Sequence, residues 1–368
     1  MENKYYIGGD LIYDKSVLFK RSNNFKIKNK NINYLYNGRS AFNRIIKSLN
    51  NNNNNNILIP SYLCGDVLIS ILKKLKYNYY IYNLDISLNC EYESIVKLID
   101  QDTTAILLIN YFGLVDNYRF AEKIKKKFKN IKIIYDVVQN PWFFFNLTAK
   151  PLTIKQQFDY VDFAFTSFKK SYPISEGSLL YSKKLIDFKK LTRNNCAFKT
   201  WKSASLLKKK FLLERNNNLL EKKYLNYFKK IDSKNNINNY NISHESFIIL
   251  NRLNLFKIAK IRIANYRFLY SALKKQKKIG ILKLEKNNIP MFFPIFIISG
   301  NRDYIIKKLK KNKIFCPVHW KLSNSLRSLI SISNAKIYDT EISIPIDHRI
   351  SKENLQTILY ELNKIIDN

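Results

Sequence analysis

The sequence contains few of the residues that build disulfide frameworks or metal centres. Among its 368 residues are four cysteines and three histidines, and no two cysteines form a CxxC pair. Both sets are scattered along the chain, at Cys64, Cys90, Cys196 and Cys316 and at His244, His319 and His348. Disulfide-stapled domains and zinc sites need more closely grouped ligands. We therefore expect neither a disulfide framework nor a metal site.

Long hydrophobic runs are also missing. The opening segment, MENKYYIGGDLIYDKS, mixes charged and apolar residues and has no continuous apolar stretch of the kind that an export signal needs. The longest apolar stretches, 105–109 and 291–298, are far shorter than the roughly 20 residues of a membrane-spanning helix. We expect a cytoplasmic protein with no membrane span.

Acidic residues are scarce, since 28 Asp and Glu face 64 Lys and Arg, which gives a formal net charge of +36. Such a charge can indicate binding to nucleic acid or to an anionic membrane surface. Here the excess is mostly Lys, is spread along the chain and accompanies many Asn and Ile residues, including the run at 50–56. A phosphate-binding face would rather concentrate Arg and aromatic residues on one element. No specific nucleic-acid partner is expected, although a non-enzymatic basic binder remains an alternative.

Short apolar runs alternate with Lys-rich amphipathic stretches over the first half of the chain. This pattern is typical of strands joined by crossover helices in a parallel sheet. It predicts helices at 66–75 and 119–128 and strands at 57–60, 79–82, 105–110, 131–135, 159–166 and 177–181. The fold class is therefore α/β.

After about residue 185 the short apolar runs give way to long charged segments with a helical pattern. Charged helical segments are predicted at 206–231 and 243–278. They are followed by strands at 292–298 and 314–318 and by helices at 302–311 and 352–366. We predict a large α/β domain over residues 1–235, and linker helices with a smaller C-terminal domain over 236–368. The Asn run at 50–56 is expected to be a solvated loop.

Two phrases place reactive groups beside predicted strands. Asp136 ends the strand in IIYDVVQNP, and ligands of parallel sheets gather at the carboxyl ends of strands. A carboxylate there can keep a pyridine nitrogen protonated, although a turn residue is the simpler reading. Lys169 and Lys170 lie between two predicted strands, where a lysine can lose its proton and form a Schiff base. In a chain so rich in Lys, the pair can equally be solvated.

Together, the two phrases resemble the DegT-type sugar aminotransferase family, a branch of the fold-type I pyridoxal-phosphate enzymes. That family has Asp-x-x-Gln after a strand, then Ser-Phe, then a lysine followed six and seven places later by an acidic residue and Gly. Asp136 and Gln139 match the first phrase and Ser167 with Phe168 the second. Glu176 lies six places after Lys170, so the resemblance assigns the Schiff base to Lys170. It also implies a mostly parallel seven-stranded sheet.

The resemblance extends over most of the chain. YNGRSAFNRII matches a family segment in which Gly38, Arg39 and Ser40 open a helix, and the positive end of a helix suits a phosphate. LIPSYLC, YNLD, LLINYFG, the linker stretch from HESF, CPVHW and SIPIDHRIS follow in the family's order.

The resemblance implies that pyridoxal 5′-phosphate binds between Asp136, at its ring nitrogen, and Lys170, which also moves protons. Gln139 would lie near the ring. Gly38, Arg39, Ser40 and Ser167 would bind the phosphate, helped by an Asn near Asn239 of a second subunit, so a homodimer with shared sites is expected.

The chain departs from the family pattern at several positions. The segment from Ser167 to Lys170 is two residues shorter than in most members, which affects the reach of Ser167. Cys64 stands where an aromatic residue usually stacks on the cofactor, and Tyr62 is the expected substitute. His319 and Trp320 fall where the family meets its acceptor, and an imidazole with an indole can bind a sugar or a diphosphate.

The implied activity is transfer of an amino group, from glutamate, to a keto-sugar that is nucleotide-linked, in the biosynthesis of a surface polysaccharide. Elimination or dehydration with the same cofactor is an alternative, but in this family such enzymes often replace the lysine by His. Lys170 therefore favours transamination.

Overall fold

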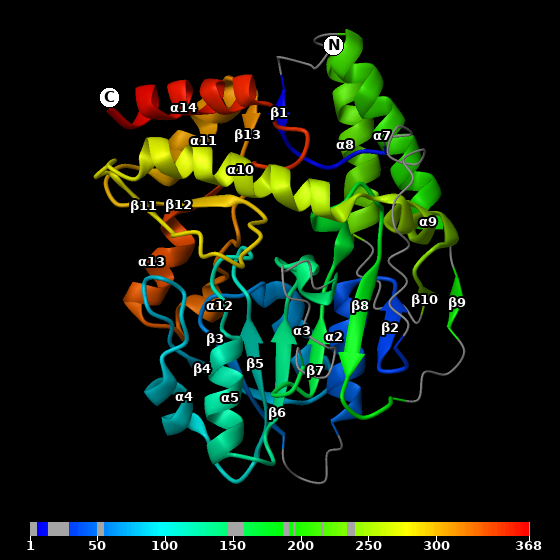
Figure 1. Cartoon of the computed structure of the whole chain (residues 1–368), viewed down its shortest axis with the longest axis vertical. Coiled ribbons are helices and arrows are strands. Elements are labelled where there is room, and N and C mark those ends of the chain that lie inside the picture. The colour runs from blue at the N-terminus through cyan, green and yellow to red at the C-terminus, as the bar shows by residue number, and fades with distance from the viewer. Residues whose placement is uncertain are drawn as a thin grey trace.

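The computed structural model describes residues 6–13, 29–49, 55–145, 158–186, 191–193, 196–214, 217–233 and 240–367. A seven-stranded sheet forms the centre of the larger part (Figure 1). Its strands are β2 (Ile32–Leu35), β3 (Asn56–Pro60), β4 (Asn78–Tyr82), β5 (Thr103–Ile109), β6 (Lys132–Asp136), β7 (Phe163–Phe165) and β8 (Ser178–Ser182).

The strands lie in the order β2-β8-β7-β6-β5-β3-β4. Neighbours from β7 to β4 pair in parallel, whereas β8 runs antiparallel to both β7 and β2. This arrangement confirms the predicted α/β class with a mostly parallel seven-stranded sheet. The strand prediction at 159–166 was too long, since only Phe163–Phe165 pairs, and β2 was not predicted because its short INYL segment buries only its two ends.

Helices cover both faces of this sheet. α2 (Gly38–Ser48) and α3 (Gly65–Lys74) lie on one face, and α4 (Tyr92–Leu98) and α5 (Tyr118–Lys127) lie on the other (Figure 1). Because both faces are covered, the central strands read as continuous apolar runs. In β5, the stretch from Ala105 to Leu108 is completely buried, and each such Ile or Leu contributes about 1.5–3 kcal/mol.

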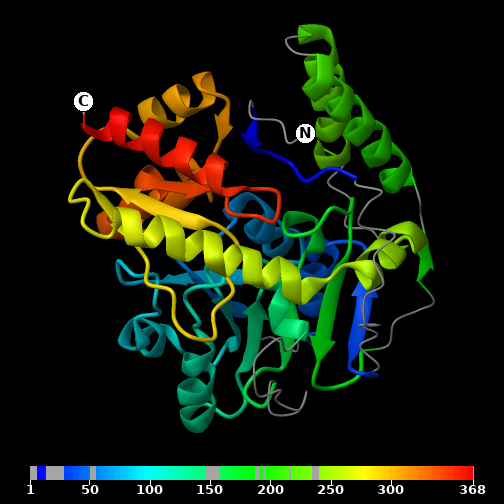
Figure 2. The same cartoon turned by 45° about the horizontal axis from the view of Figure 1, so that its top comes forward.

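Four helices connect the two parts of the molecule. They are α7 (Cys196–Glu214), α8 (Asn218–Ser233), α9 (His244–Arg252) and α10 (Leu255–Leu273). α7 and α8 pack side by side and project outward, and α10 crosses above the sheet (Figure 2). α7 begins at Cys196, before the predicted start at 206, and each predicted helical segment overlaps two helices. The second one is interrupted at Asn254, whose side chain caps α10 by accepting from Lys257 N.

The C-terminal part is built on a second, antiparallel sheet. It consists of β11 (Ile279–Ile281), β12 (Phe293–Ile297) and β14 (Glu341–Ile344), with β12 in the middle. Around it lie α11 (Arg302–Lys311), α12 (Asn324–Arg327), α13 (Ile332–Thr340) and α14 (Lys352–Asp367). Two shorter parallel pairs join distant segments, β1 (Ile7–Gly8) with β13 (Ile314–Phe315) and β9 (Thr192–Arg193) with β10 (Tyr240–Asn241).

The pairing of β1 with β13 attaches the start of the described chain to the C-terminal part. The division at 235/236, which places the N-terminal segment with the large domain, stays a prediction. β13 is also shorter than the predicted strand at 314–318, because the chain leaves the ladder before Pro317, which lacks an N–H donor.

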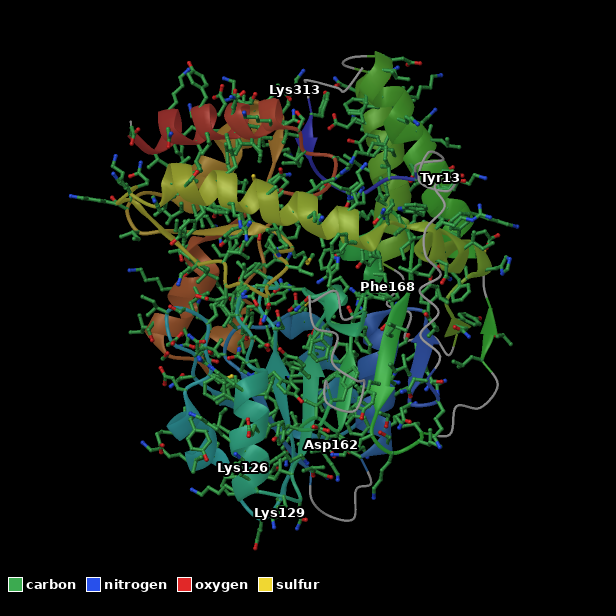
Figure 3. The ribbon with its side chains drawn as sticks, in the orientation of Figure 1. Tyr13, Lys126, Lys129, Asp162, Phe168 and Lys313 are labelled. Carbon is green, nitrogen blue, oxygen red and sulfur yellow. The ribbon has the colours of Figure 1, made fainter. Side chains whose placement is uncertain are left out.

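Basic side chains lie at opposite ends of the molecule. Figure 3 shows Lys126 and Lys129 at the lower end of the large sheet and Lys313 at the top. Asp162, also at the lower end, forms ion pairs with Lys125 (2.7 Å) and Lys132 (3.6 Å). In the part of the chain that the structure describes, no helix is long and apolar enough to cross a membrane.

Candidate active site

A cavity of about 380 Å³ lies at the carboxyl ends of the parallel strands, between the large sheet and the C-terminal part. Asp136 and Phe165 contribute from strand ends, and His319 and Trp320 from the opposite wall. Segments that are far apart in the sequence therefore converge on one space, at the edge of the sheet where parallel α/β folds bind ligands.

Asp136 ends β6 and is the buried acid of this cavity. The Val138 N–H donates to its Oδ1 at 2.8 Å, which orients the carboxyl group and leaves Oδ2 for another partner. Burial raises the pKa of Asp136 to about 6, while the Val138 N–H and the positive charge of Lys170 pull it back down. A carboxylate with so few donors can stabilise a cationic N–H that enters the cavity.

Lys170 ends η2 (Phe168–Lys170), a single 3₁₀ turn that follows β7. The turn is fixed by Phe168 N–H, which donates to Gly177 O at 2.8 Å, and by Ser171 N–H, which donates to Phe168 O at 3.0 Å. Lys170 is half-buried, whereas Lys169 is exposed, and both line the cavity. Burial is the main cause of the pKa shifts of Asp136, His319 and Cys64, which line the same cavity, and the charge of Lys170 acts to lower all three pKa values.

The acidic residue and Gly that follow the lysine have clear structural roles. Glu176 is buried in the cavity wall and accepts hydrogen bonds from Ser243 N (3.2 Å), Ser243 Oγ and Ser175 Oγ. Ser243 is the N-cap of α9, so this carboxylate ties the lysine loop to the connecting helices. Gly177 has φ +131°, and a Cβ there would lie 2.7 Å from Ile242 Cδ1, so the position requires glycine.

The start of α2 forms the anion-binding side of the cavity. The side chain of Asn37 caps the helix by accepting from Ser40 N at 2.8 Å. Gly38 and Arg39 line the cavity beside it, and the first turn of the helix has no acidic residue. A Cβ on Gly38 would meet Thr166 O at 3.3 Å and Ser167 Cβ at 3.5 Å. This crowded helix N-terminus suits a phosphate.

The structure brings Ser167 next to this helix end and into the cavity lining. Ser40 is buried and is not among the lining residues, and its N–H is used by the cap. Asn239, expected from a second subunit, lies outside the described residues.

Gln139 lies three residues after Asp136, in the turn that follows β6, and is almost completely buried. Its Oε1 accepts from Phe112 N at 2.8 Å, which fixes the amide, while its Nε2 has no hydrogen-bond partner among the described residues. Gln139 also lines the cavity. A buried donor left free is costly unless a ligand accepts from it, so this residue fits a cofactor with a ring oxygen.

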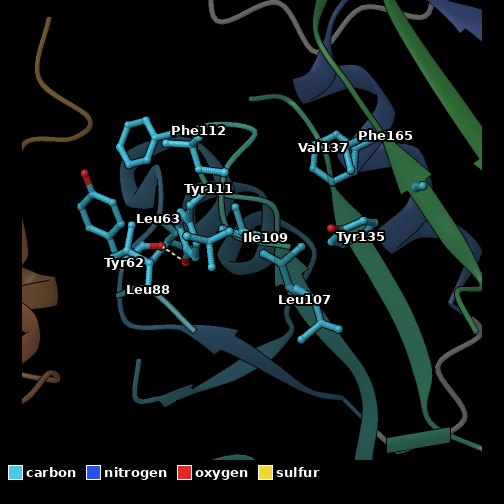
Figure 4. Packing of buried hydrophobic residues seen from close by; sticks show 14 of the residues in the cluster. Tyr62, Leu63, Leu88, Leu107, Ile109, Tyr111, Phe112, Tyr135, Val137 and Phe165 are labelled. Carbon is cyan, nitrogen blue, oxygen red and sulfur yellow. Dashed lines mark hydrogen bonds between the residues drawn. The ribbon is translucent and has the colours of Figure 1, made fainter. Parts of the chain in front are cut away.

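Tyr62 does not line the cavity. Its ring is fully buried against Tyr111, Trp320 and Tyr338, at centroid distances of 5.6, 5.1 and 4.7 Å. Figure 4 shows Tyr62 beside Tyr111, whose hydroxyl donates to Tyr62 O at 2.5 Å. Cys64 lines the cavity instead, and burial raises the pKa of its thiol. The tyrosine supports the Trp320 wall from behind, and the position suggested for a stacking aromatic holds Cys64.

His319 and Trp320 both reach the cavity, as expected for acceptor residues. The backbone N–H of His319 donates to Glu341 Oε2 at 2.6 Å, and its Nδ1 lies 2.9 Å from Ser343 Oγ. Burial, followed by the charge of Lys170, lowers the pKa of His319 to about 3, and burial raises that of Glu341 to about 8. Although His319 Nδ1 lies 4.0 Å from Glu341 Oε1, the imidazole is neutral at pH 7, so the contact is not an ion pair.

Of the predicted site residues, the cavity collects Asp136, Lys170, Gln139, Gly38, Arg39, Ser167, His319 and Trp320. Tyr36, Asn37, Cys64 and Glu176 also line it, without having been assigned binding roles from the sequence. Asn37 had a usable signal, because Asn just before a Gly-led helix is a preferred N-cap. Among the described residues, no three His, Cys, Asp or Glu side chains form a group that could hold a metal ion.

No protein-family model matches the chain, and no curated protein matches it by sequence. Solved structures do match over nearly its whole length. PseC of Helicobacter pylori, an aminotransferase involved in the biosynthesis of pseudoaminic acid, has a TM-score of 0.66 at 14% identity and covers 100% of both chains. A DegT DnrJ EryC1 StrS aminotransferase from Brucella abortus has a TM-score of 0.61 at 15% identity, covering 92% of this chain and 86% of that one.

NtdA from Bacillus subtilis, solved with bound cofactor PMP, has a TM-score of 0.62 at 13% identity and covers 98% of this chain and 79% of that one. The structures that the chain resembles thus include DegT-type aminotransferases, as expected from the sequence. At these identities the likeness establishes the fold alone, which this chain shares with those aminotransferase structures.

Proposed function

We propose that this protein is a pyridoxal-phosphate-dependent aminotransferase that transfers an amino group to a keto-sugar. The observation that carries the proposal is the joint placement of Asp136, Gln139 and Lys170 around one cavity that also contains a helix N-terminus. This combination offers an acid, a free amide donor, an amine and an anion site at one location. The fold shared with sugar aminotransferases supports the same reaction class.

Pyridoxal phosphate supplies an aldehyde that binds an amine and a cationic ring that accepts electrons from the reacting carbon. Asp136 Oδ2 would accept from the ring N–H, and Gln139 Nε2 would donate to the ring oxygen. The amides at the start of α2 and Ser167 would hold the phosphate. Lys170 would anchor the aldehyde through its amine and, once displaced, would move a proton between the substrate carbon and the cofactor.

The C-terminal wall would exclude water from this chemistry. Trp320 is held in place by Tyr62, and the neutral His319 by Glu341 and Ser343. A neutral imidazole and an indole can contact the hydroxyl groups and apolar face of a sugar without adding charge. This placement supports a role for His319 and Trp320 in binding the acceptor.

We further propose glutamate as the amino donor, a nucleotide-linked keto-sugar as the acceptor and a surface polysaccharide as the end product, following the family resemblance. The homodimer with shared sites and the cytoplasmic location stay predictions.

The test separates the two halves of the reaction. Protein loaded with pyridoxal phosphate is mixed with glutamate, and 2-oxoglutarate is measured, with Lys170→Ala as the inactive control. A keto-sugar is then added, and the aminated sugar is sought by mass spectrometry. We expect one equivalent of 2-oxoglutarate per site followed by amination. Release of ammonia or water without transfer would instead identify an elimination enzyme, and no response to any amino donor would refute the proposal.

A further inference from the structure

A second cavity, of about 420 Å³, adjoins the first, because Lys169, Lys170 and His319 line both. Its remaining walls come from the first described segment and from the C-terminal part, and they include Arg262, Lys310 and Arg349. Among the described residues, five cations line this cavity, against the two acids Asp10 and Asp347. The space next to the reactive amine is therefore positively charged.

Arg262 is the unusual residue of this cavity. It lies on α10, is only 1% exposed and has no carboxylate of the described residues within 4.0 Å. Its Nη1 donates to Met291 O and its Nη2 to Ser171 O at 3.3 Å, while its Nε has no hydrogen-bond partner among the residues that the structure describes. The guanidinium lies over the Trp142 ring at 5.3 Å. The described groups in direct contact with the guanidinium are thus all neutral.

Asp347 is the acid whose charge acts on Arg262, but its carboxylate is already paired with Arg349. Asp347 accepts from Arg349 Nε at 2.8 Å through Oδ1 and from Arg349 Nη2 at 2.9 Å through Oδ2. Burial lowers the pKa of Arg262 to about 10 despite the charge of Asp347, so the guanidinium remains cationic at pH 7 without full compensation. A buried cation with an unused donor is costly unless an anion joins it.

We propose that Arg262 binds an anionic oxygen group of the substrate, a carboxylate or a phosphate, in this second cavity while the reacting end of the substrate lies at Lys170. The inference rests on the proposed function, which supplies two substrates that carry such groups, the amino acid and the nucleotide-linked sugar. Because the guanidinium presents planar donors, it suits an oxyanion better than a lysine would.

The test is isothermal titration calorimetry on protein loaded with pyridoxal phosphate, with two unreactive probes. Glutarate represents the carboxylate source and uridine diphosphate the phosphate source. We expect one probe to bind wild type, and Arg262→Lys and Arg262→Gln to raise its dissociation constant at least tenfold. Arg267→Gln, which removes an exposed cation from the same helix, should leave binding within about twofold, since exposed charges are screened by salt.

The probe whose dissociation constant rises in the Arg262 variants identifies the substrate group as a carboxylate or a phosphate. If neither probe binds wild type, or if no bound probe is weakened by the Arg262 substitutions, the inference is wrong. Lys310→Gln provides a second variant in case Arg262 is needed for folding, because Lys310 is exposed on the same wall, and it should weaken the responding probe at least twofold at low salt. Unchanged affinity in Lys310→Gln would then count against the site. The absorbance of the bound cofactor, recorded first, reports failure of the proposed function separately.

Discussion

Asp136 and Lys170 line one cavity, and the positive charge of Lys170 opposes the rise in pKa that burial causes at Asp136. The two groups come from different strands, since Asp136 ends β6 and Lys170 follows β7 after one 3₁₀ turn. Parallel pairing of β6 with β7, which sets Asp136 opposite Phe165, brings them to the same end of the sheet. The relationship links the fold directly to the chemistry.

The first prediction concerns the cost of keeping Asp136 ionised. A pKa of about 6, against the ordinary 3.8, corresponds to about 3 kcal/mol of unfavourable burial at neutral pH. Asp136→Asn keeps an acceptor for Val138 N–H and removes the charge. The cofactor-free variant should therefore be more stable than wild type at pH 8, while binding pyridoxal phosphate much more weakly.

Urea denaturation and cofactor titration measure the two effects. Asp159→Asn, which neutralises an exposed carboxylate just before β7, should change neither. A less stable Asp136→Asn protein that still binds the cofactor normally would contradict the assigned role.

The second prediction is a dependence of stability on pH that arises from Glu341. Its folded pKa of about 8 lies above the ordinary 4.5, so its contribution to stability is complete below about 4.5 and is lost as pH rises towards 8. The loss should approach about 1.4 kcal/mol per pH unit within that window. Glu341→Gln cannot titrate and should lack this component.

The stability of wild type minus that of Glu341→Gln should consequently fall between pH 5 and pH 8 in urea denaturation curves. A stability difference that stays constant between pH 5 and pH 8 would show that the folded pKa of Glu341 is not raised. Because His319 stays neutral in both proteins over this range, it should not obscure the result.

The third prediction concerns the glycine after Glu176. Gly177→Ala should destabilise the protein by about 1–3 kcal/mol, because φ is +131° and the new methyl would lie 2.7 Å from Ile242 Cδ1. Gly280→Ala is the matched control, since its nearest neighbours would be at 3.7 Å, an ordinary contact distance. The melting temperatures of Gly177→Ala and Gly280→Ala are measured by thermal unfolding. Equal values would be inconsistent with the backbone conformation described for Gly177.

Much of the large sheet could be predicted from the sequence because its central strands are buried on both faces. The continuous apolar runs that became β3, β5 and β6 follow directly from that burial. The antiparallel direction of β8 could not be predicted, because a buried strand has the same composition in either direction. β14 was missed for another reason, since its EISI segment contains the buried Glu341, an unusual residue for a strand interior.

The candidate site also contains some residues that could be predicted from the sequence and others that could not. Asp136 could be located from the sequence because it ends a predicted strand, at the edge of the sheet where ligands gather. The choice of Lys170 came from the family resemblance, since position between two strands alone did not separate it from Lys169. The bond between Glu176 and Ser243 and the position of Arg262 depend on how α9 and α10 pack against that loop. Such contacts between distant segments leave no local pattern in the sequence. Tyr62 was expected to stack on the cofactor, but its ring packs against Trp320 and Tyr338, behind the cavity wall. Its position near the site in the sequence did not reveal this.

The most direct measurement is borohydride reduction of the protein after incubation with pyridoxal phosphate, followed by proteolysis and mass spectrometric mapping of the labelled peptide. We predict that the cofactor mass is found on Lys170, that Lys170→Ala carries no label and that Lys169→Ala is labelled like wild type. Labelling of Lys169, of scattered surface lysines, or of no lysine at all would contradict the assignment of this cavity as the cofactor site.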